Sequence, residues 1–233
     1  MASFALSSAK PERGLGMEGI IAKWYAGLTK KSLEDFRLLA RQVAKQLPPD
    51  ASVLEVAPGP GYFAIELAKL GDYRITGLDI SSTFVEIARK NAAEANVAID
   101  FQRGNASIMP FKRESFDFLL CRAAFKNFAA PLGALREMHR VLKPGGRALI
   151  IDLRKDSSKE SVSQAVDEMK LGAVNQVLTK LTFRYMLLKR AYTRNDFEEM
   201  IGQTGFDKFE IHESLTGLDV WLNKFPAPVL SAP

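Results

Sequence analysis

Residues that build cross-linked or metal-bound sites are scarce in this chain. Its 233 residues include one cysteine, Cys121, and two histidines, His139 and His212. A single cysteine excludes an internal disulfide framework and a cysteine metal cluster, and it fits a reducing compartment, so we expect a cytoplasmic protein. His139 is expected on a surface helix and His212 on a late strand far from any motif, so neither is well placed to act as a general base. The sequence therefore predicts no metal site and no catalytic triad, and the catalytic residue stays unknown.

Long apolar runs are also missing. Residues 1–10 do not combine a charged start with a long apolar stretch, so we expect no secretory signal. No stretch approaches the roughly 20 apolar residues of a membrane span. Hydrophobic residues make up 47% of the chain and charged residues 25%, which indicates one globular domain with a sizeable core. The net charge of +5 predicts no specific nucleic-acid partner, and it permits peripheral contact with an anionic membrane.

The most informative segment is a glycine loop that follows an apolar run. Residues 52–57 are typical of a buried strand, Gly59 and Gly61 mark a tight turn, and an apolar helical pattern follows at once. Glycines let a ligand approach the backbone, and a helix N-terminus offers N–H groups. Glu55 places a carboxylate inside the strand, where burial is unfavourable unless a partner or ligand uses it. The turn is predicted to hold a ligand that uses both a carboxylate and backbone amides.

Two ligand classes fit this turn. Gly59-x-Gly61-x-x-Ala64 matches the short dinucleotide fingerprint, and Asp79 follows roughly 20 residues later, as a ribose-binding acid would. An NAD(P)-dependent oxidoreductase is therefore one alternative. That enzyme would need a catalytic set after the fingerprint, and the Tyr-x-x-x-Lys string at residues 185–189 lies in the wrong part of the chain order.

Four ordered motifs favour another class of ligand. They are Glu55-x-Ala57-x-Gly59-x-Gly61, Gly77-Leu78-Asp79-Ile80-Ser81, Gly104-Asn105-Ala106-x-x-Met109-Pro110-Phe111 with Ser115-Phe116-Asp117, and Arg140-Val141-Leu142-Lys143-Pro144-Gly145-Gly146-Arg147. Together, over roughly residues 50–155, they resemble the class I S-adenosylmethionine (SAM)-dependent methyltransferases. The run 122–146 is similar to the ubiquinone/menaquinone C-methyltransferase-like branch. The chain departs from the family in having Ala57 for its first glycine and Asn105 for its usual aspartate.

The resemblance implies both a fold and a reaction. The fold is an α/β three-layer Rossmann-like sandwich, with a mostly parallel seven-stranded sheet and one antiparallel strand near the C-terminus. The reaction is transfer of a methyl group from SAM to a small, partly apolar acceptor by in-line displacement, with S-adenosylhomocysteine (SAH) as product and no metal. A SAM-fold binding protein or non-methylating enzyme is a further alternative. No oligomeric state is predicted.

The resemblance also implies which residues hold the cofactor. Glu55 would organise the loop and the amino group of the methionine moiety, and Tyr25 would cover that end from an N-terminal helix. Asp79 would accept hydrogen bonds from two ribose hydroxyls. The full cofactor set is Tyr25, Glu55, Ala57, Pro58, Gly59, Gly61, Asp79, Ile80, Asn105, Ala106 and Arg122. The substrate set is Trp24, Lys126, Tyr185 and Met186.

Strand and helix patterns alternate as far as residue 153, which predicts a parallel sheet covered by helices on both faces. Strands are expected at 52–57, 73–79, 98–103, 116–122 and 148–153, helices at 33–47, 62–70, 83–96, 132–142 and 193–205, and an antiparallel strand pair at 209–213 and 218–222. Residues 157–191 read as helical, cationic and apolar, which fits a helix pair covering the sheet, a lid over an acceptor pocket, or a surface that docks on an anionic membrane. The predicted divisions are a helical cap (1–47), the SAM-binding core (48–156), a helical lid (157–192), the C-terminal part of the core (193–224) and a tail (225–233).

Overall fold

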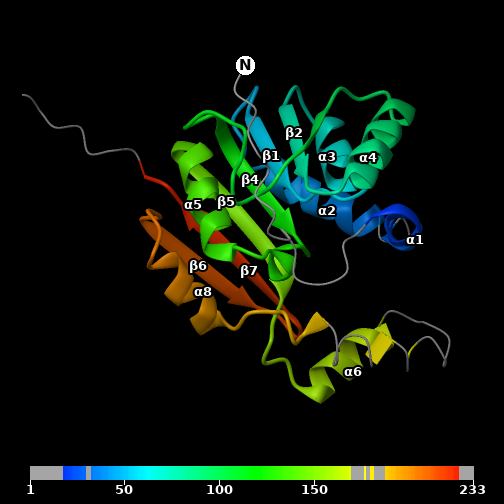
Figure 1. The fold of residues 1–233 in the computed structure, drawn as a ribbon, viewed down its shortest axis with the longest axis vertical. Coiled ribbons are helices and arrows are strands. Elements are labelled where there is room, and N and C mark those ends of the chain that lie inside the picture. The colour runs from blue at the N-terminus through cyan, green and yellow to red at the C-terminus, as the bar shows by residue number, and fades with distance from the viewer. Residues whose placement is uncertain (1–17, 30–32, 169–175, 177–178, 181–186, 226–233) are drawn as a thin grey trace, which may run out of the picture.

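A seven-stranded sheet forms the centre of the protein in the order β3-β2-β1-β4-β5-β7-β6 (Figure 1). The structure is a computed structural model that describes residues 18–29, 33–168, 176, 179–180 and 187–225. Strands β1 to β5 pair in parallel, whereas β7 pairs antiparallel with both β5 and β6. The predicted fold class, including its one reversed strand, is confirmed. The strands are β1 (Ser52–Val56), β2 (Arg74–Asp79), β3 (Asp100–Arg103), β4 (Phe116–Arg122), β5 (Leu142–Leu153), β6 (Lys208–Glu213) and β7 (Gly217–Asn223).

Helices cover both faces of this sheet and give the three layers. One face carries α2 (Leu33–Ala44), α3 (Tyr62–Ala68) and α4 (Ser82–Glu94), and the other carries α5 (Pro131–Val141) and α8 (Arg194–Ile201). The remaining described elements are α1 (Gly19–Thr29), the short 3-10 helix η2 (Phe125–Asn127) and α6 (Lys159–Glu168).

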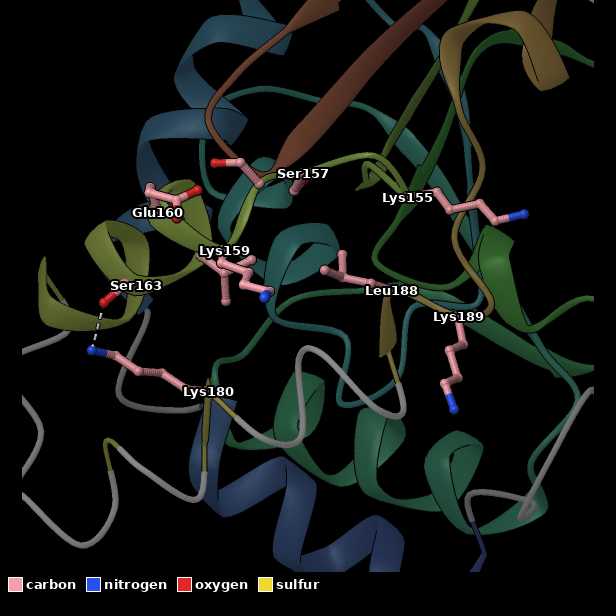
Figure 2. Close-up of a pocket in the computed structure, with 10 residues that line it drawn as sticks. Lys155, Ser157, Lys159, Glu160, Ser163, Lys180, Leu188 and Lys189 are labelled. Atoms are coloured by element: carbon pink, nitrogen blue, oxygen red, sulfur yellow. Dashed lines mark hydrogen bonds between the residues drawn. The ribbon is translucent and has the colours of Figure 1, made fainter.

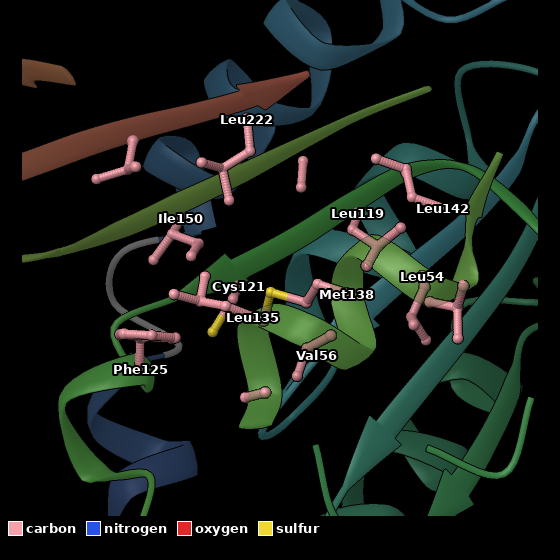
Figure 3. Packing of buried hydrophobic residues seen from close by; sticks show 14 of the residues in the cluster. Leu54, Val56, Leu119, Cys121, Phe125, Leu135, Met138, Leu142, Ile150 and Leu222 are labelled. Carbon is pink, nitrogen blue, oxygen red and sulfur yellow. The ribbon is translucent and has the colours of Figure 1, made fainter. Parts of the chain in front are cut away.

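The central strands supply both cores because successive side chains point to opposite faces. In β1, Val53 packs against α2 and α3, whereas Leu54 and Val56 pack on the α5 side. Figure 3 shows this second core, with Leu135 and Met138 from α5 lying against the sheet. Burial on both faces explains why these strands read as nearly continuous apolar runs. Glu55 is therefore a buried carboxylate, 3% exposed, in the middle of the sheet.

One predicted boundary is wrong. The sequence predicted a helix to Leu142 and a strand only from Ala148, but β5 already begins at Leu142. Leu142 pairs with Phe116, and after a register shift Arg147 pairs with Phe118. The Lys143–Gly146 segment bulges between these two pairs, so the glycines that suggested a turn lie inside an interrupted strand. Most other predicted boundaries differ from the observed ones by two residues or fewer.

A buried lysine ties the end of the sheet to α5. Lys224 Nζ donates to the carbonyl oxygens of Leu142 at 2.7 Å and His139 at 3.2 Å, and it pairs with Glu114 Oε1 at 3.3 Å. These carbonyls belong to the C-terminal turn of α5, where helical partners run out. Lys224 therefore acts as a C-terminal cap contributed by a residue distant in the sequence.

Replacing this cap should destabilise the fold. Lys224→Met keeps an apolar stem but removes the donor from the buried carbonyl of Leu142 and the partly buried carbonyl of His139, so we expect the free energy of unfolding to fall by about 2 kcal/mol. The matched control is Lys208→Met, because Lys208 is exposed and its ion pair with Glu210 should contribute at most about 1 kcal/mol. Urea unfolding measures both variants. An equal loss of unfolding free energy in Lys224→Met and Lys208→Met would show that the hydrogen bonds of Lys224 to the end of α5 do not stabilise the fold.

Candidate active site

The predicted cofactor residues converge at the carboxyl edge of the parallel strands. Ala57, Asp79 and Arg122 follow or end β1, β2 and β4, which pair in parallel and therefore end at the same edge. The strand order reverses between β1 and β4, since the chain runs from β1 out to β3 before crossing back. Ligands of open α/β sheets bind in the crevice at such a reversal.

The loop between β1 and α3 turns through three left-handed residues. Ala57, Gly59 and Gly61 have φ values of 56°, 54° and 77°. A Cβ on Gly61 would lie 2.7 Å from a ring carbon of Phe101, so this position also needs glycine for close packing. A Cβ on Gly59 would meet only Phe84, at 4.0 Å, among the described residues. The backbone at Gly59 therefore borders open space that a ligand can use.

Ala57 adopts its left-handed conformation without being glycine. This geometry costs an L-residue with a Cβ roughly 1–2 kcal/mol. Ala57 N–H donates to the Leu78 carbonyl at 2.8 Å, which fixes the turn against β2. The replacement of the family's first glycine is thus accommodated, at the expense of local strain.

Two buried carboxylates hold this loop. Glu55 Oε2 accepts from Ala64 N–H at 3.1 Å and so fastens the first turn of α3. Asp79 Oδ2 accepts from Gly59 N–H at 3.0 Å, and its Oδ1 accepts from Ser81 N–H at 2.9 Å. Asp79 thus joins the glycine loop to the entrance of α4. Ser81 caps α4, which leaves Asp79 at the edge of the sheet rather than in a capping role.

The environment of Glu55 changes its protonation. Burial raises the pKa of Glu55 to about 8, an effect that Asp79 adds to and that the Ala64 N–H bond and the charge of Arg122 oppose. At neutral pH, most of the protein without cofactor therefore carries Glu55 as the uncharged acid. A cation placed beside this carboxyl would draw the proton off.

Tyr25 reaches the same edge from α1. Its ring meets Phe84 edge-on with centroids 6.0 Å apart. Burial raises the pKa of the Tyr25 hydroxyl. The positive charge of Arg122 lowers this pKa and the negative charge of Asp152 raises it, so both side chains lie close enough to Tyr25 to interact with it electrostatically. Trp24 precedes Tyr25 in α1, but its side chain lies outside the described residues.

Two contacts fasten α1 to the core. The Tyr62 hydroxyl, at the start of α3, donates to the carbonyl of Ala26 at 3.0 Å. The Glu18 carboxylate accepts from Ser82 N–H at 2.9 Å and Thr83 N–H at 3.1 Å, which are free donors at the N-terminus of α4. The N-terminal segment is thereby attached beside both helices that flank the glycine loop. The sequence analysis missed Glu18, because its partners lie 64 and 65 residues away and leave no local signal.

A buried ion pair between Lys126, in η2 after β4, and Asp152, near the end of β5, lies at the same edge of the sheet. Lys126 Nζ lies 2.8 Å from Asp152 Oδ1, and the side chains are 5% and 2% exposed. Lys126 also donates from Nζ to the Ala123 carbonyl at 2.6 Å and from its backbone N–H to Asp152 Oδ2 at 2.8 Å. The ammonium predicted to contact substrate is thus held by Asp152. The sequence analysis missed Asp152, although a carboxylate within an apolar strand is the same signal that pointed to Glu55.

The other predicted residues are placed as follows. Asn105, two residues after β3, accepts from Ser107 N–H through Oδ1 at 2.9 Å, and Ala106 beside it is half-buried. Ile80 directly follows β2, and the Arg122 guanidinium lies over the Phe36 ring at 4.3 Å. Pro58 is buried in the glycine loop. Tyr185 and Met186 lie outside the described residues.

Comparisons with known proteins agree with this geometry. Residues 54–150 match the family described as a methyltransferase domain. The demethylmenaquinone methyltransferase of Chlorobaculum parvum is 30% identical over 179 residues, covering 73% of each chain. The ubiquinone/menaquinone biosynthesis C-methyltransferase UbiE of Bartonella tribocorum is 31% identical over 189 residues, covering 75% of this chain and 72% of that protein. The chain belongs to the class I SAM-dependent methyltransferases.

Within that family the chain falls in the UbiE-like branch, and it is a SAM-dependent methyltransferase. An NAD(P)-dependent oxidoreductase is not favoured. A solved structure supports the fold: a provisionally assigned SAM-dependent methyltransferase from Methanococcus maripaludis superposes with a TM-score of 0.73 at 21% identity, covering 95% of this chain and 100% of that one.

Two further searches concern the described part of the chain only. None of its helices combines the length and the apolar character needed to cross a bilayer. It also contains no group of three or more histidine, cysteine, aspartate or glutamate side chains arranged to hold a metal ion.

Proposed function

We propose that this methyltransferase transfers its methyl group to a ring carbon of a small hydroquinone-type acceptor. The observation that carries the proposal is the match to a demethylmenaquinone methyltransferase at 30% identity across 73% of both chains. The lone cysteine fits a cytoplasmic location, and the positive net charge is compatible with contact at an anionic membrane surface.

The residues at the carboxyl edge fit SAM. Gly59 borders open space, so a ligand can approach the backbone there, and Asp79 offers carboxylate oxygens to a ribose diol beside it. We assign the adenine surroundings to Ile80, Asn105 and Ala106. Ala57, Pro58 and Gly61 shape the loop, and Glu55, Arg122 and Tyr25 surround the methionine end. When bound, SAM supplies an electrophilic methyl group on a sulfonium.

The protein's own residues would act on the acceptor by orientation and electrostatics. A phenolate is a better carbon nucleophile than a phenol. Arg122, whose charge lowers the pKa of both Glu55 and Tyr25, would favour the ionised form of a bound hydroquinone. The buried Lys126–Asp152 pair would keep the floor of the pocket rigid. Positioning and exclusion of water are then the main contributions of the fold.

We further propose that the acceptor enters between the N-terminal cap and the lid. Trp24, Tyr185 and Met186 would contact it, and residues 1–47 and 157–192 would act as the two covers of core 48–156. Covers of this kind have to open for substrate and close for reaction.

The acceptor proposal is tested by product analysis. The protein is incubated with SAM carrying a trideuterated methyl group and a short-chain demethylated naphthohydroquinone under reducing conditions. We expect SAH and a ring-methylated product in equal amounts, with the label on carbon by fragmentation. A naphthohydroquinone already methylated at that ring position is the matched control and should give neither. Label found on oxygen, or no labelled product with either hydroquinone, would refute the proposal.

A further inference from the structure

A phenylalanine from α2 supports the guanidinium of Arg122. The guanidinium carbon lies 4.3 Å from the centre of the Phe36 ring, which is the geometry of a cation–π contact. Tyr62, the first residue of α3, packs against the same ring with centroids 5.8 Å apart. Phe36 follows the helical spacing of Ala40 and Val43, which are buried in the core beneath α2. Helix packing therefore holds the ring in place, and the ring in turn supports the cation.

The backbone of Arg122 is fixed by the sheet. Arg122 pairs with Ile151 where the parallel pairing of β4 with β5 ends. The next residue, Ala123, donates its N–H to the Ile151 carbonyl at 2.7 Å and turns the chain away with a φ of 58°. The side chain of Arg122 is then what remains to be oriented. A long arginine side chain has many rotamers, and a cation–π contact of about 0.5–2 kcal/mol favours those that keep it over the ring.

The described part of the chain does not engage the N–H groups of Arg122. Among these residues, its guanidinium donates no hydrogen bond and forms no ion pair. A ring face leaves the donor edge of the planar fork available for an anionic oxygen. Two nearby carboxyl groups have other partners, since Glu55 accepts from a backbone N–H of α3 and Asp152 holds Lys126. The charge of Arg122 nevertheless lowers the pKa of both Glu55 and Tyr25, so the cation lies beside the candidate active site.

We propose that Phe36 is a positioning residue, which orients the guanidinium of Arg122 toward the ionised oxygen of the methyl acceptor. This inference rests on the proposed function, in which Arg122 favours the ionised form of a bound hydroquinone. The ring contacts the face of the guanidinium, and the N–H edge donates to the phenolate oxygen. Phe36 touches no reacting atom in this arrangement, so it acts only through Arg122.

The first test is a double-mutant cycle on the pH profile of the single-turnover rate, with saturating SAM and the short-chain demethylated naphthohydroquinone. In Arg122→Gln the acid limb should move up by about one pH unit, because the bound phenol loses a nearby positive charge. Phe36→Leu should move it in the same direction by a smaller amount, and combining the two substitutions should add nothing to Arg122→Gln alone. Phe36→Tyr keeps an aromatic face and should retain the wild-type profile. Additive shifts in the double variant, or no shift in Phe36→Leu, would overturn the proposal.

The matched control for lost packing is Leu39→Ala. Leu39 lies in the same helix and packs on the same core as Phe36, but it does not support the guanidinium. This variant should lose stability to urea, as Phe36→Leu does, and keep the pH profile of the wild type. An equal shift of the profile in Leu39→Ala would show that loosened packing, and not the orientation of Arg122, causes the effect.

One other cationic position is compared with Arg122. A cavity of about 760 Å³ opens beside the start of α6, and Lys159 and Glu160 line it (Figure 2). Neither Arg122 nor Phe36 lines this cavity. Lys159→Gln should therefore leave the pH profile unchanged. A shift as large as that of Arg122→Gln would place the ionised oxygen at the cavity and contradict the proposal.

A second arm needs no acceptor. Arg122 lowers the pKa of Glu55, against the effects of burial and of Asp79. If the ring holds Arg122 in place, the pH midpoint at which the cofactor-free protein loses stability should rise in Arg122→Gln and in Phe36→Leu, but not in Leu39→Ala. Urea unfolding across pH measures these midpoints. An unchanged midpoint in Phe36→Leu refutes the positioning role for any acceptor. A raised midpoint without labelled product from the naphthohydroquinone supports the positioning role and refutes only the proposed acceptor.

Discussion

Raising the pH from about 6 to about 9 should destabilise the protein without cofactor, and Glu55→Gln should remove most of that loss. Burial raises the pKa of Glu55 from 4.5 to about 8, so the folded protein holds this proton more tightly than the unfolded chain does. The resulting stabilisation is fully present below pH 4.5 and is lost as the pH rises through about 8. At about 1.4 kcal/mol per pH unit over the two units from pH 6 to the folded pKa, and with little further change above it, the loss is about 3 kcal/mol.

Urea unfolding at a series of pH values measures this effect. Glutamine keeps a carbonyl oxygen for Ala64 N–H but has no proton to release, so the stability of Glu55→Gln should stay nearly level over the same range. The matched control is Glu94→Gln, whose carboxylate is exposed on α4 and should leave the pH dependence of the wild type in place. If wild type and Glu55→Gln lose stability in parallel, Glu55 is ionised in the folded protein and its proposed environment is wrong.

Asp79→Asn should weaken SAH binding by roughly ten- to a hundredfold, or about 1.5–3 kcal/mol, because a ribose hydroxyl loses a charged acceptor. The effect has a second source in the structure. Both Asp79 oxygens accept backbone N–H groups, so an amide nitrogen at one of them would repel Gly59 or Ser81 and loosen the loop. The fold itself should survive, since Ser81 still caps α4.

Calorimetric titration of SAH into the variant measures this loss. Asp100→Asn is the matched control, because Asp100 is exposed at the start of the neighbouring strand β3. Its SAH affinity should equal that of the wild type. An unchanged dissociation constant in Asp79→Asn would remove Asp79 from the cofactor site.

The parts of the fold that the sequence predicted depend on local, repeated patterns. Apolar runs, glycine turns and helix periods identified the central strands, and the Glu55-to-Gly61 string pointed to the ligand loop. The helix predicted from residue 193 is present as α8, and Thr193 and Asp196 form a capping box at its start. The start of β5 was mispredicted, because Pro144-Gly145-Gly146 is typical of a turn and only pairing with β4 shows a bulged strand.

The parts that the sequence could not predict depend on distant partners. Glu18 accepts a hydrogen bond from the N-terminus of α4, more than 60 residues away in the sequence. Lys224 caps the C-terminus of α5 from more than 80 residues away. Lys126 was selected as a substrate contact, but its pairing with Asp152 appears only when β4 and β5 lie side by side. Such contacts follow from tertiary packing, for which a single sequence carries no periodic signal.

The most direct test of the central claim, that the glycine loop and Asp79 form a SAM site, is a pair of calorimetric titrations on the wild-type protein. SAH should bind one-to-one with a micromolar dissociation constant, and NAD should give no heat of binding under the same conditions. Binding of NAD with no heat from SAH would contradict the assignment of this site.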